Sequence, residues 1–327
     1  MLKNFKNAKV LIAGGLGFIG SNLARRLAGL NAKVTLIDSL VPEHGGNLFN
    51  IAEIKGKVAV NISDVRNTQE LRGVVKGQDY LFNFAGQTSH LDSMRDPYTD
   101  LEMNCRAQLS ILEACRNYNP DIKIVFASTR QIYGKPKYLP VDEGHPIQPV
   151  DINGINKIAG EQYHILYNNV YGIRCCVLRL TNTYGPHMRI KDGRQTFVGL
   201  WIRSLIENKP FEVWDGKQLR DFNYIDDVVD AMLLAAVDNS ADGEIFNLGA
   251  GDVINLKELA ELLMEVNGQG KYIIKPFPAS RKKIDIGDYY SNFKKIQYIL
   301  GWKPKITLRN GFISTLDFYR KNLSRYI

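Results

Sequence analysis

Long hydrophobic runs are absent from this sequence of 327 residues. The first apolar stretch begins at Val10 and is broken by Gly14 and Gly15, which makes it too short for a signal peptide core or a membrane span. The longest later run lies around residues 231–237 and also falls short of the ~18 apolar residues that a membrane span requires. We therefore expect a soluble, cytoplasmic protein with no membrane partner.

Cysteine is scarce, and the cysteines present form no recognisable metal or disulfide pattern. Cys105, Cys115, Cys175 and Cys176 include no C-x-x-C pair and no cysteine–histidine spacing typical of zinc. We expect buried, reduced thiols and no metal site.

Runs of one charge are absent as well. The 42 Lys and Arg residues outnumber the 34 Asp and Glu residues and give a net charge of +8, yet no run of five or more basic residues occurs. Scattered charge of this kind is typical of a solvated surface and suits a small phosphorylated ligand. We expect no nucleic-acid partner.

What the sequence does contain is an ordinary globular composition, with 45% hydrophobic and 23% charged residues. This composition excludes a disordered, collagenous or disulfide-stapled chain. The length exceeds the ~100–200 residues of a typical single domain. We expect either one large α/β unit or two unequal parts that share a cleft.

The first forty residues predict a strand, a glycine-rich turn, a helix and a second strand. The continuous apolar run 10–13 is typical of a strand that is buried on both faces. Residues 14–20 (GGLGFIG) follow at once, apolar residues then recur at helical spacing as far as Leu30, and a second strand is expected at 33–38. This order is that of a βαβ unit.

The alternation of strands and helices continues to about residue 180. We expect strands at 58–62, 80–84, 122–127 and 174–180, and helices at 68–75, 98–118 and 155–170. Strict succession of this kind predicts an α/β fold with a doubly wound parallel sheet.

After residue 185 the pattern loosens, and prolines punctuate shorter segments. We expect this part to form a smaller α/β lobe. The predicted division is a sheet domain made mainly of residues 1–180 and a lobe made mainly of residues 181–327, with a segment at about 220–250 returning to the sheet domain.

Three glycines in the first turn indicate a dinucleotide site. Gly14 allows a tight turn, Gly17 lets the backbone approach a pyrophosphate, Gly20 lets helix and strand pack closely, and the helix N-terminus offers N–H donors to phosphate. Asp38 ends the next strand, where its carboxylate can accept from both ribose hydroxyls of an adenosine and would repel a 2′-phosphate. We expect the cofactor to be NAD rather than NADP.

Further short segments follow this turn in a fixed order along the chain. They are 63–65 (SDV), 83–87 (NFAGQ), 96–97 (DP) with Asn104, 126–134 (FASTRQIYG), 182–186 (NTYGP), 218–227 (QLRDFNYIDD), 246–249 (FNLG) and 300–304 (LGWKP). With the glycine turn, this series resembles the extended short-chain dehydrogenases/reductases of the NAD-dependent nucleotide-sugar epimerase/dehydratase family over nearly the whole chain. The resemblance implies a Rossmann-type sheet, a nucleotide-diphosphate sugar substrate, and a homodimer formed through the helices 98–118 and 155–170.

The resemblance also assigns residues to the two ligands. The cofactor-binding residues it implies are Gly14, Gly17, Phe18, Ile19, Gly20, Asp38, Asp64, Val65, Phe84, Ala85, Gln87, Asn104 and Lys157. For the sugar nucleotide it implies Asn182 and Arg220 on the diphosphate, with Arg189, Arg194 and Arg281 as further candidates.

The family's catalytic tyrosine is missing. Most such enzymes carry a Tyr four residues before a Lys on one helix face, where positive charge lowers the pKa of the phenol and makes it a base. Here Lys157 is present, but Asn153 stands in the place of the tyrosine, and an amide cannot act as a general base. Thr129 aligns with the catalytic Ser or Thr of the family.

Three interpretations of this site stay open. Another group can take the proton, either Lys157 through a water held by Asn153, or Tyr133 or His187 from a neighbouring loop. The protein can be a slow or specialised enzyme that oxidises one position of a sugar without full turnover. It can also be a catalytically silent binder of NAD and sugar nucleotides.

The two residues after Thr129 narrow the chemistry. Related 4,6-dehydratases have an acid and a base there, whereas this sequence has Arg130 and Gln131, which cannot do that work. The stretch also lacks the cysteine expected of the family's 3,5-epimerases. We therefore expect an NAD-dependent epimerase that reversibly oxidises C4 of an NDP-hexose, with a nucleotide-sugar 4-dehydrogenase, an atypical dehydratase or a non-catalytic binding protein as alternatives.

Overall fold

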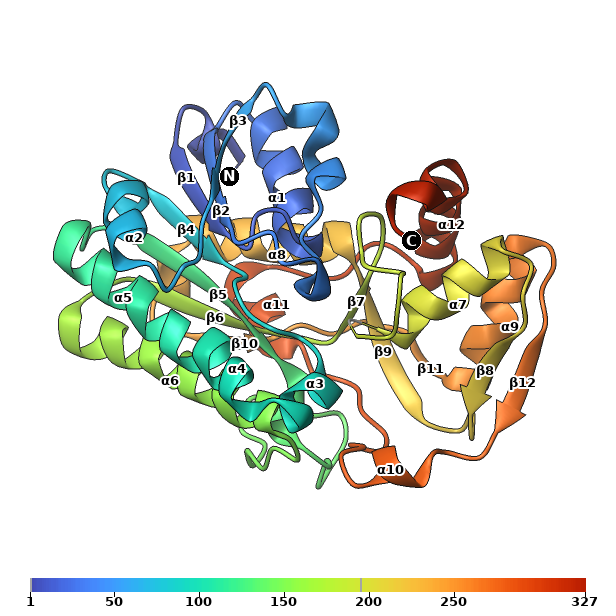
Figure 1. Ribbon diagram of the computed structural model, residues 1–327. Coiled ribbons are helices and arrows are strands. Elements are labelled where there is room, and N and C mark those ends of the chain that lie inside the picture. Colours follow the sequence, from blue (N-terminus) through green and yellow to red (C-terminus); the bar gives the residue numbers. More distant parts are fainter. Residues whose placement is uncertain (1, 195) are drawn as a thin grey trace.

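The structure, a computed structural model, describes residues 2–194 and 196–327 (Figure 1). Its centre is a seven-stranded sheet in the order β10-β6-β5-β4-β1-β2-β3, in which every neighbouring pair is parallel. The strands are β1 (Lys9–Ala13), β2 (Lys33–Asp38), β3 (Val58–Ile62), β4 (Tyr80–Asn83), β5 (Lys123–Thr129), β6 (Cys175–Leu180) and β10 (Ile245–Asn247). The predicted doubly wound α/β sheet is thereby confirmed.

Helices cover both faces of this sheet, as its apolar strands require. One face is covered by α2 (Thr68–Val75), α5 (Ala107–Tyr118) and α6 (Ile152–Tyr171), and the other by α1 (Phe18–Gly29) and α8 (Ile225–Val237). None of the helices in the described part of the chain is long and apolar enough to span a membrane.

The strand order reverses between β1 and β4. From β1 the chain builds outward through β2 and β3, and from β4 it builds in the opposite direction through β5 and β6. Loops that leave the carboxyl ends of the strands separate at such a switch point and form a crevice, which is where ligands bind in sheets of this type.

Most of the remaining chain forms a smaller lobe at the carboxyl edge of the sheet (Figure 1). One small sheet has the order β11-β9-β7, and a second pairs β12 with β8. The elements of this region are β7 (Asn182–Tyr184), α7 (Phe197–Ile206), β8 (Phe211–Trp214), β9 (Leu219–Tyr224), β11 (Val253–Asn255), α9 (Leu256–Asn267), β12 (Tyr272–Lys275), α10 (Ala279–Lys282) and α12 (Leu308–Asn322).

Short helical segments connect the larger elements. They are η1 (Leu2–Phe5), η2 (Pro42–His44), η3 (Leu48–Ile54), α3 (His90–Arg95), α4 (Pro97–Leu101), η4 (Glu102–Arg106), η5 (Arg130–Tyr133), η6 (Asn239–Ala241), α11 (Lys294–Leu300) and η7 (Leu323–Arg325). The single helix expected at 98–118 is therefore three consecutive segments, α4, the π-helical η4 and α5.

Helix α6 begins three residues earlier than expected, and the difference bears on the site. Asp151 is its N-cap, and the Asp151 Oδ1 atom accepts a hydrogen bond from Gly154 N at 2.7 Å. A capping carboxylate satisfies N–H groups that the first turn leaves free. Asn153 consequently lies in the first turn of α6, and Lys157 lies one turn further along the same face.

Candidate active site

The glycine turn after β1 packs directly against the segment that follows β4. Gly14 has a positive φ of 75°, and a Cβ atom there would lie 2.9 Å from the carbonyl carbon of Phe84. Only glycine fits this conformation and this spacing. The N-cap of α1 is Gly17, which has no side chain to satisfy the first N–H groups of the helix. Those donors remain available to a phosphate.

Asp38 lies at the carboxyl end of β2 and faces this turn. Its two carboxylate oxygens accept hydrogen bonds from Leu16 N at 2.9 Å and from Leu40 N at 2.8 Å. Burial raises the pKa of Asp38, and the two N–H donors oppose that rise. The carboxylate is thus fixed in position at one end of the crevice.

A cavity at the switch point brings together many of the residues that the sequence predicted for the cofactor. Gly14, Gly17, Asp38, Asp64, Val65, Phe84 and Ala85 line it, together with His44, Gly86 and Met103. Phe18, Ile19 and Gly20 lie in the first turn of α1 and do not line it.

Asp64 is engaged by a neighbouring arginine at the rim of this cavity. Arg66 forms a two-pronged contact with its carboxylate, with Nε 3.0 Å from Oδ1 and Nη2 2.6 Å from Oδ2. Hydrogen bonding to Arg66 lowers the pKa of Asp64. Its side chain is therefore held as an anion.

The segment that follows β4 is held in place by Asn104. Asn104 Nδ2 donates to the carbonyl of Gln87 at 3.0 Å, and Asn104 Oδ1 accepts from Gln87 N at 3.2 Å. Asn104 is fully buried and does not line the cavity. Its direct partner is therefore the backbone that forms the floor of the crevice.

Asn153 is part of the same buried network. Its Nδ2 donates to Gln87 O at 3.0 Å and to Asp100 Oδ2 at 3.1 Å, and its own N–H donates to Ser93 Oγ at 3.3 Å. Asn104 and Asn156 also donate to the Asp100 carboxylate. Three amides therefore surround one buried carboxylate beside the first turn of α6.

Lys157 lies directly behind the floor of the crevice. A Cβ atom at Gly86 would be 3.1 Å from Lys157 Nζ, and the ammonium is 5.3 Å from the centre of the Phe126 ring. Burial lowers the pKa of Lys157 to about 8, although the negative charge of Asp100 opposes that change. The site therefore holds an ammonium that loses its proton more easily than an exposed lysine.

Thr129 and Tyr133, both predicted to be catalytic, have different surroundings. Thr129 ends β5, is partly exposed, and accepts a hydrogen bond from Gln131 N at 3.2 Å, which leaves its hydroxyl proton free to be donated. Tyr133 is completely buried, donates to Asn247 Oδ1 at 2.7 Å and accepts from Arg179 at 2.6 Å. Burial raises its pKa to about 12. This placement argues against Tyr133 as a base.

His187, the other predicted alternative base, is also engaged elsewhere. Its Nδ1 lies 2.8 Å from the hydroxyl of Tyr326, and its ring packs against Phe318. Burial lowers its pKa to about 4. It therefore belongs to the packing beneath α12.

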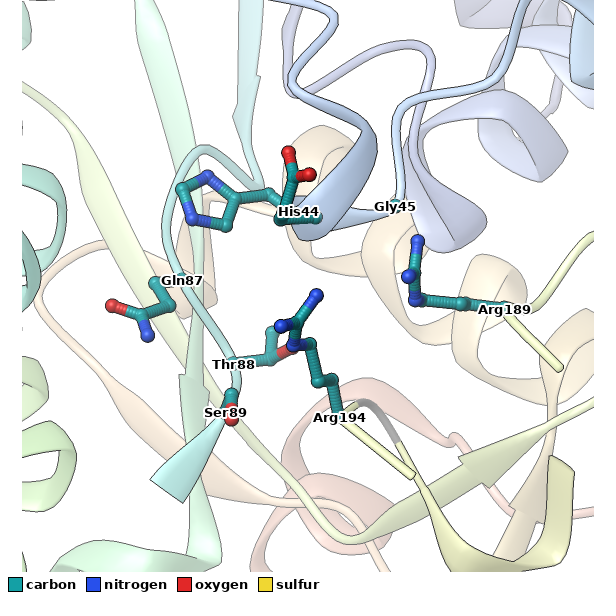
Figure 2. Close-up of a pocket in the computed structure, with 8 residues that line it drawn as sticks. His44, Gly45, Gln87, Thr88, Ser89, Arg189 and Arg194 are labelled. Atoms are coloured by element: carbon teal, nitrogen blue, oxygen red, sulfur yellow. The ribbon is translucent and has the colours of Figure 1, made fainter. Parts of the chain in front are cut away.

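A second cavity adjoins the first, because His44 lines both. Figure 2 shows Arg189 and Arg194 reaching it from the segment after β7, with His44 and Gly45 on another side and residues 87–89 on a third. Arg189 also contacts Asp192, and Arg194 contacts Asp92 with 2.9 Å between Nε and Oδ2. Two of the arginines predicted for the substrate thus lie beside the cofactor cavity.

The other predicted substrate residues form a separate group around β7 and β9. Asn182 Oδ1 accepts from Arg130 Nη2 at 2.8 Å, and Asn182 Nδ2 donates to the Asp221 carbonyl at 2.9 Å. Arg220 is buried, donates to the carbonyls of Leu219 and Gly287, and lies 3.7 Å from Asp285. Burial and the nearby charge of Arg130 lower the pKa of Arg220 to about 10.

Arg281 lies apart from this group. It belongs to α10, where its guanidinium stacks on the Trp214 ring at 4.6 Å from the ring centre. In the described residues it lines neither of the two cavities.

Several side chains at the site were missed by the sequence analysis. His44, Thr88 and Ser89 line the second cavity, although no motif marks them. His44 belongs to the loop that leaves the carboxyl end of β2, and the rule that such loops form the site would have found it. Asp100 carries no motif, and two of its three amide partners, Asn153 and Asn156, are distant in sequence.

The residues present at the switch point fit a bound dinucleotide. The turn at Gly14 leaves no space for a side chain, the N–H groups at the start of α1 are free, and a fixed carboxylate stands at the end of β2. Across residues 2–194 and 196–327, no cluster of three or more His, Cys, Asp or Glu side chains could hold a metal ion.

Comparison with known proteins agrees with this geometry. Residues 10–249 match the model of the NAD dependent epimerase/dehydratase family. A Methanocaldococcus jannaschii protein, to which UDP-glucose 4-epimerase activity is provisionally attributed, is 34% identical over 317 residues, which is 96% of this chain and 99% of that protein.

Solved structures give the same result. UDP-glucose 4-epimerase of Thermotoga maritima with UDP-glucose has a TM-score of 0.88 at 29% identity and covers 96% of this chain and 99% of its own. UDP-glucose 4-epimerase of Thermus thermophilus with NAD has a TM-score of 0.85 at 28% identity and covers 95% of this chain and 99% of its own. This chain therefore belongs to the NAD-dependent epimerase/dehydratase family, and its cofactor is NAD.

Proposed function

We propose that the protein is a nucleotide-sugar epimerase that reversibly oxidises C4 of an NDP-hexose. The observation that carries this proposal is the position of Lys157, whose ammonium lies against Gly86 at the floor of the cofactor crevice. A cation there can stabilise the oxygen of a sugar hydroxyl as it loses its proton. When bound, NAD supplies the chemistry of accepting a hydride from the sugar carbon and returning it.

Lys157 serves in this proposal as a cation. With a pKa of about 8 it is mainly protonated at neutral pH, so it can donate to an oxygen but is a poor acceptor of protons. Thr129 supplies a second hydroxyl donor at the end of β5. Together they hold one oxygen of the sugar beside the cofactor.

The groups after Thr129 support epimerisation over dehydration. Arg130 donates to Asn182, and its guanidinium lies 5.2 Å from the centre of the Tyr289 ring. Gln131 donates to Asp151 at 2.8 Å. Neither side chain can protonate a leaving hydroxyl and remove a carbon-bound proton in the same cycle.

Four arginines and one asparagine are proposed to hold the diphosphate and the sugar. Arg130, Asn182 and Arg220 form one group, and Arg189 and Arg194 form the other beside the cofactor cavity. Arginine forks suit the paired oxygens of a diphosphate. We propose a UDP-sugar as the first substrate to test, because the compared proteins are named as UDP-glucose 4-epimerases.

The predicted homodimer is also part of this proposal. Ile155, Leu166 and Val170 on α6 and Leu109 on α5 are exposed apolar side chains on the same side of the sheet. Burying such a face against a second copy would remove it from water. Light scattering on the purified protein tests this, and a monomeric mass would contradict it.

The function is tested by incubating the purified protein with NAD and a panel of UDP-, GDP-, CDP- and dTDP-sugars. Proton NMR of the sugar region then identifies any product. The proposal expects one sugar nucleotide to convert to its C4 epimer until both are present at equilibrium. Accumulation of a 4-keto-6-deoxy sugar would indicate a dehydratase, and an unchanged panel with tight NAD binding would indicate a non-catalytic binder.

A further inference from the structure

We propose that His90, oriented by Asp151, is the acid–base residue that takes the place of the missing tyrosine. This inference rests on the proposed function, because it assigns the proton transfer of that reaction. His90 Nδ1 lies 2.9 Å from Asp151 Oδ2.

Asp151 is built to remain an anion and to hold the imidazole. Its side chain is fully buried, Oδ1 accepts from Gly154 N at 2.7 Å, and Oδ2 accepts from Gln131 Nε2 at 2.8 Å as well as facing His90. Burial raises the pKa of Asp151, but the interactions with His90, Gly154 and Gln131 outweigh that effect and lower it.

The carboxylate determines which nitrogen of His90 carries the proton. An ionised carboxylate can only accept hydrogen bonds, so the 2.9 Å approach of Asp151 Oδ2 favours the neutral tautomer with the proton on Nδ1. Nε2 is then left with a lone pair that can accept a proton. A buried carboxylate that fixes the tautomer of a histidine in this way is a general device of acid–base catalysis.

The edge of the His90 ring that faces away from Asp151 is accessible to solvent. Nδ1 is buried 2.9 Å from Asp151 Oδ2, without the angle of a formed hydrogen bond, whereas 39% of the His90 side chain is exposed. The exposed part is therefore the opposite edge of the ring, which carries Nε2. The other candidate bases are less accessible or already protonated. Tyr133 and His187 are buried, and Lys157 is mainly protonated at neutral pH.

The position of His90 in the fold places it among the predicted catalytic segments. Residues 87–89, immediately before it, line the second cavity, and His90 is the next residue beyond that lining. Asp151 lies two residues before Asn153, and Gln131, which shares the Asp151 carboxylate, lies two residues after Thr129. The imidazole thus stands where the end of β5, the start of α3 and the start of α6 meet.

Helix α3 is fixed to α6 at this point. Ser93 Oγ donates to the carbonyl of His90 at 2.8 Å and accepts from Asn153 N at 3.3 Å. Asn153 therefore helps to hold the backbone that carries the histidine. Asn153 and the His90–Asp151 pair, here called the dyad, therefore belong to one arrangement.

The proton transfer is balanced with the oxidation of the sugar. In the forward step the O–H bond of the 4-hydroxyl breaks and its proton bonds to His90 Nε2. The hydrogen of C4 would leave together with its electron pair, as the hydride that bound NAD accepts, and the C4–O bond would become a double bond. On return the imidazolium gives the proton back to oxygen, and C4 regains its hydrogen and electron pair.

The test uses the full-length protein with NAD and UDP-glucose, or the sugar nucleotide that the NMR panel identifies. His90→Gln keeps a donor toward Asp151 but removes the ring nitrogen that is proposed to accept the proton. Asp151→Asn keeps an N-cap for α6, because Asn caps helices as well as Asp, but removes the charge. Arg95→Gln is the matched control on the same helix, since its side chain is 78% exposed.

We expect His90→Gln to lower kcat by roughly 10²–10⁴-fold, the usual value of a positioned acid or base, with KM changed by less than about threefold. Asp151→Asn should lower kcat with KM similarly preserved, and Arg95→Gln should leave both unchanged. Imidazole added to His90→Ala should restore part of the lost kcat. A wild-type kcat in His90→Gln, or a loss confined to KM, would overturn the proposal.

A second measurement does not depend on turnover. Diethyl pyrocarbonate should modify His90 in the wild-type protein, and sugar nucleotide with NAD should protect it, as peptide mass spectrometry can show. Modification unaffected by sugar nucleotide would place His90 outside the substrate site and overturn the proposal. A wild-type protein inert toward every sugar nucleotide would instead refute the proposed function and the dyad with it, whereas an active His90→Gln variant would refute the dyad alone.

Discussion

Asn153 Nδ2 donates a hydrogen bond to the carboxylate of Asp100, with 3.1 Å between the two atoms, in the interior of the protein. Asn104 and Asn156 donate to the same carboxylate at 3.0 and 2.8 Å. An unpaired buried carboxylate is costly, and three amide donors offset that cost. Asn153 is therefore part of a structural network beneath the site.

The first prediction concerns this pair. Asn153→Ala removes two hydrogen bonds and should lower the free energy of unfolding by ~1–3 kcal/mol, independently of pH. Asn153→Asp puts a second carboxylate beside Asp100 and should lower the free energy of unfolding at pH 7 by more than Asn153→Ala does. Because like charges raise a carboxyl pKa, one of the two should take up a proton as the pH falls.

The difference in free energy of unfolding between Asn153→Asp and the wild type should therefore become smaller as the pH falls from 7 to 5. The corresponding difference for Asn153→Ala should stay constant. Urea unfolding of the three proteins at both pH values measures this. A constant difference for Asn153→Asp would contradict the close approach of the two carboxylates.

The second prediction concerns the buried charge of Lys157. Its pKa falls from 10.5 to about 8 on folding, so below pH 8 the burial of its charge costs about 3 kcal/mol. Between pH 8 and pH 10.5 the unfolded chain binds the proton and the folded chain does not, so this cost disappears as the pH rises.

Lys157→Met should therefore be more stable than the wild type at pH 7 by up to about 3 kcal/mol, with the gain lost by about pH 10.5, and it should be inactive. Urea unfolding of the cofactor-free proteins at pH 7 and 10 measures the difference. Lys321→Met on the surface of α12 is the control and should change little. A destabilised Lys157→Met at pH 7 would contradict the burial argument.

The third prediction concerns Asp38 and the choice of cofactor. Asp38→Ala should weaken NAD binding by ~1.5–3 kcal/mol, typical of a hydrogen bond to a charged group, and should narrow the preference for NAD over NADP. Asp38→Asn keeps an acceptor for the N–H of Leu16 or Leu40 but removes the negative charge. Comparison with Asp38→Ala therefore distinguishes the effect of the charge from that of the turn geometry. Titration calorimetry with both cofactors measures the effect, and release of NADP from the denatured wild type would refute the ribose assignment.

The fourth prediction concerns Arg220 and the substrate. Arg220→Ala should weaken binding of UDP and UDP-sugars at least tenfold and leave NAD binding nearly unchanged. Arg220→Lys should not restore binding, because an ammonium lacks the planar fork. Arg309→Ala, an exposed arginine paired with Glu265, is the control. Equal losses for cofactor and substrate in calorimetry would mean that Arg220 acts only by holding the carbonyl of Gly287.

The sheet could be predicted from sequence because its signals are local. Continuous apolar runs, a glycine turn and helical spacing are each contained in a few residues, and the predicted strands and helices on both sides of the sheet are present. Helix α6 begins three residues before the predicted start, because Asp151 caps it there, whereas the apolar spacing is interrupted by the polar Asn153.

The site could be predicted only where its residues share a motif. Gly14, Gly17 and Asp38 lie together in the crevice, as the βαβ pattern requires. Contacts between distant segments leave no such pattern. Asp151 and His90 are far apart in the sequence, and the hydroxyl of Tyr133 is occupied by Asn247, which lies 114 residues further along the chain.

The most direct measurement follows the hydrogen on C4. The converted sugar nucleotide is prepared with deuterium at C4 and incubated with the protein and NAD in ordinary water. Reversible oxidation at C4 predicts an epimer that retains the deuterium on the same carbon, detected by NMR and mass spectrometry. Loss of that deuterium to solvent, or a product changed at another carbon, would contradict the proposed reaction.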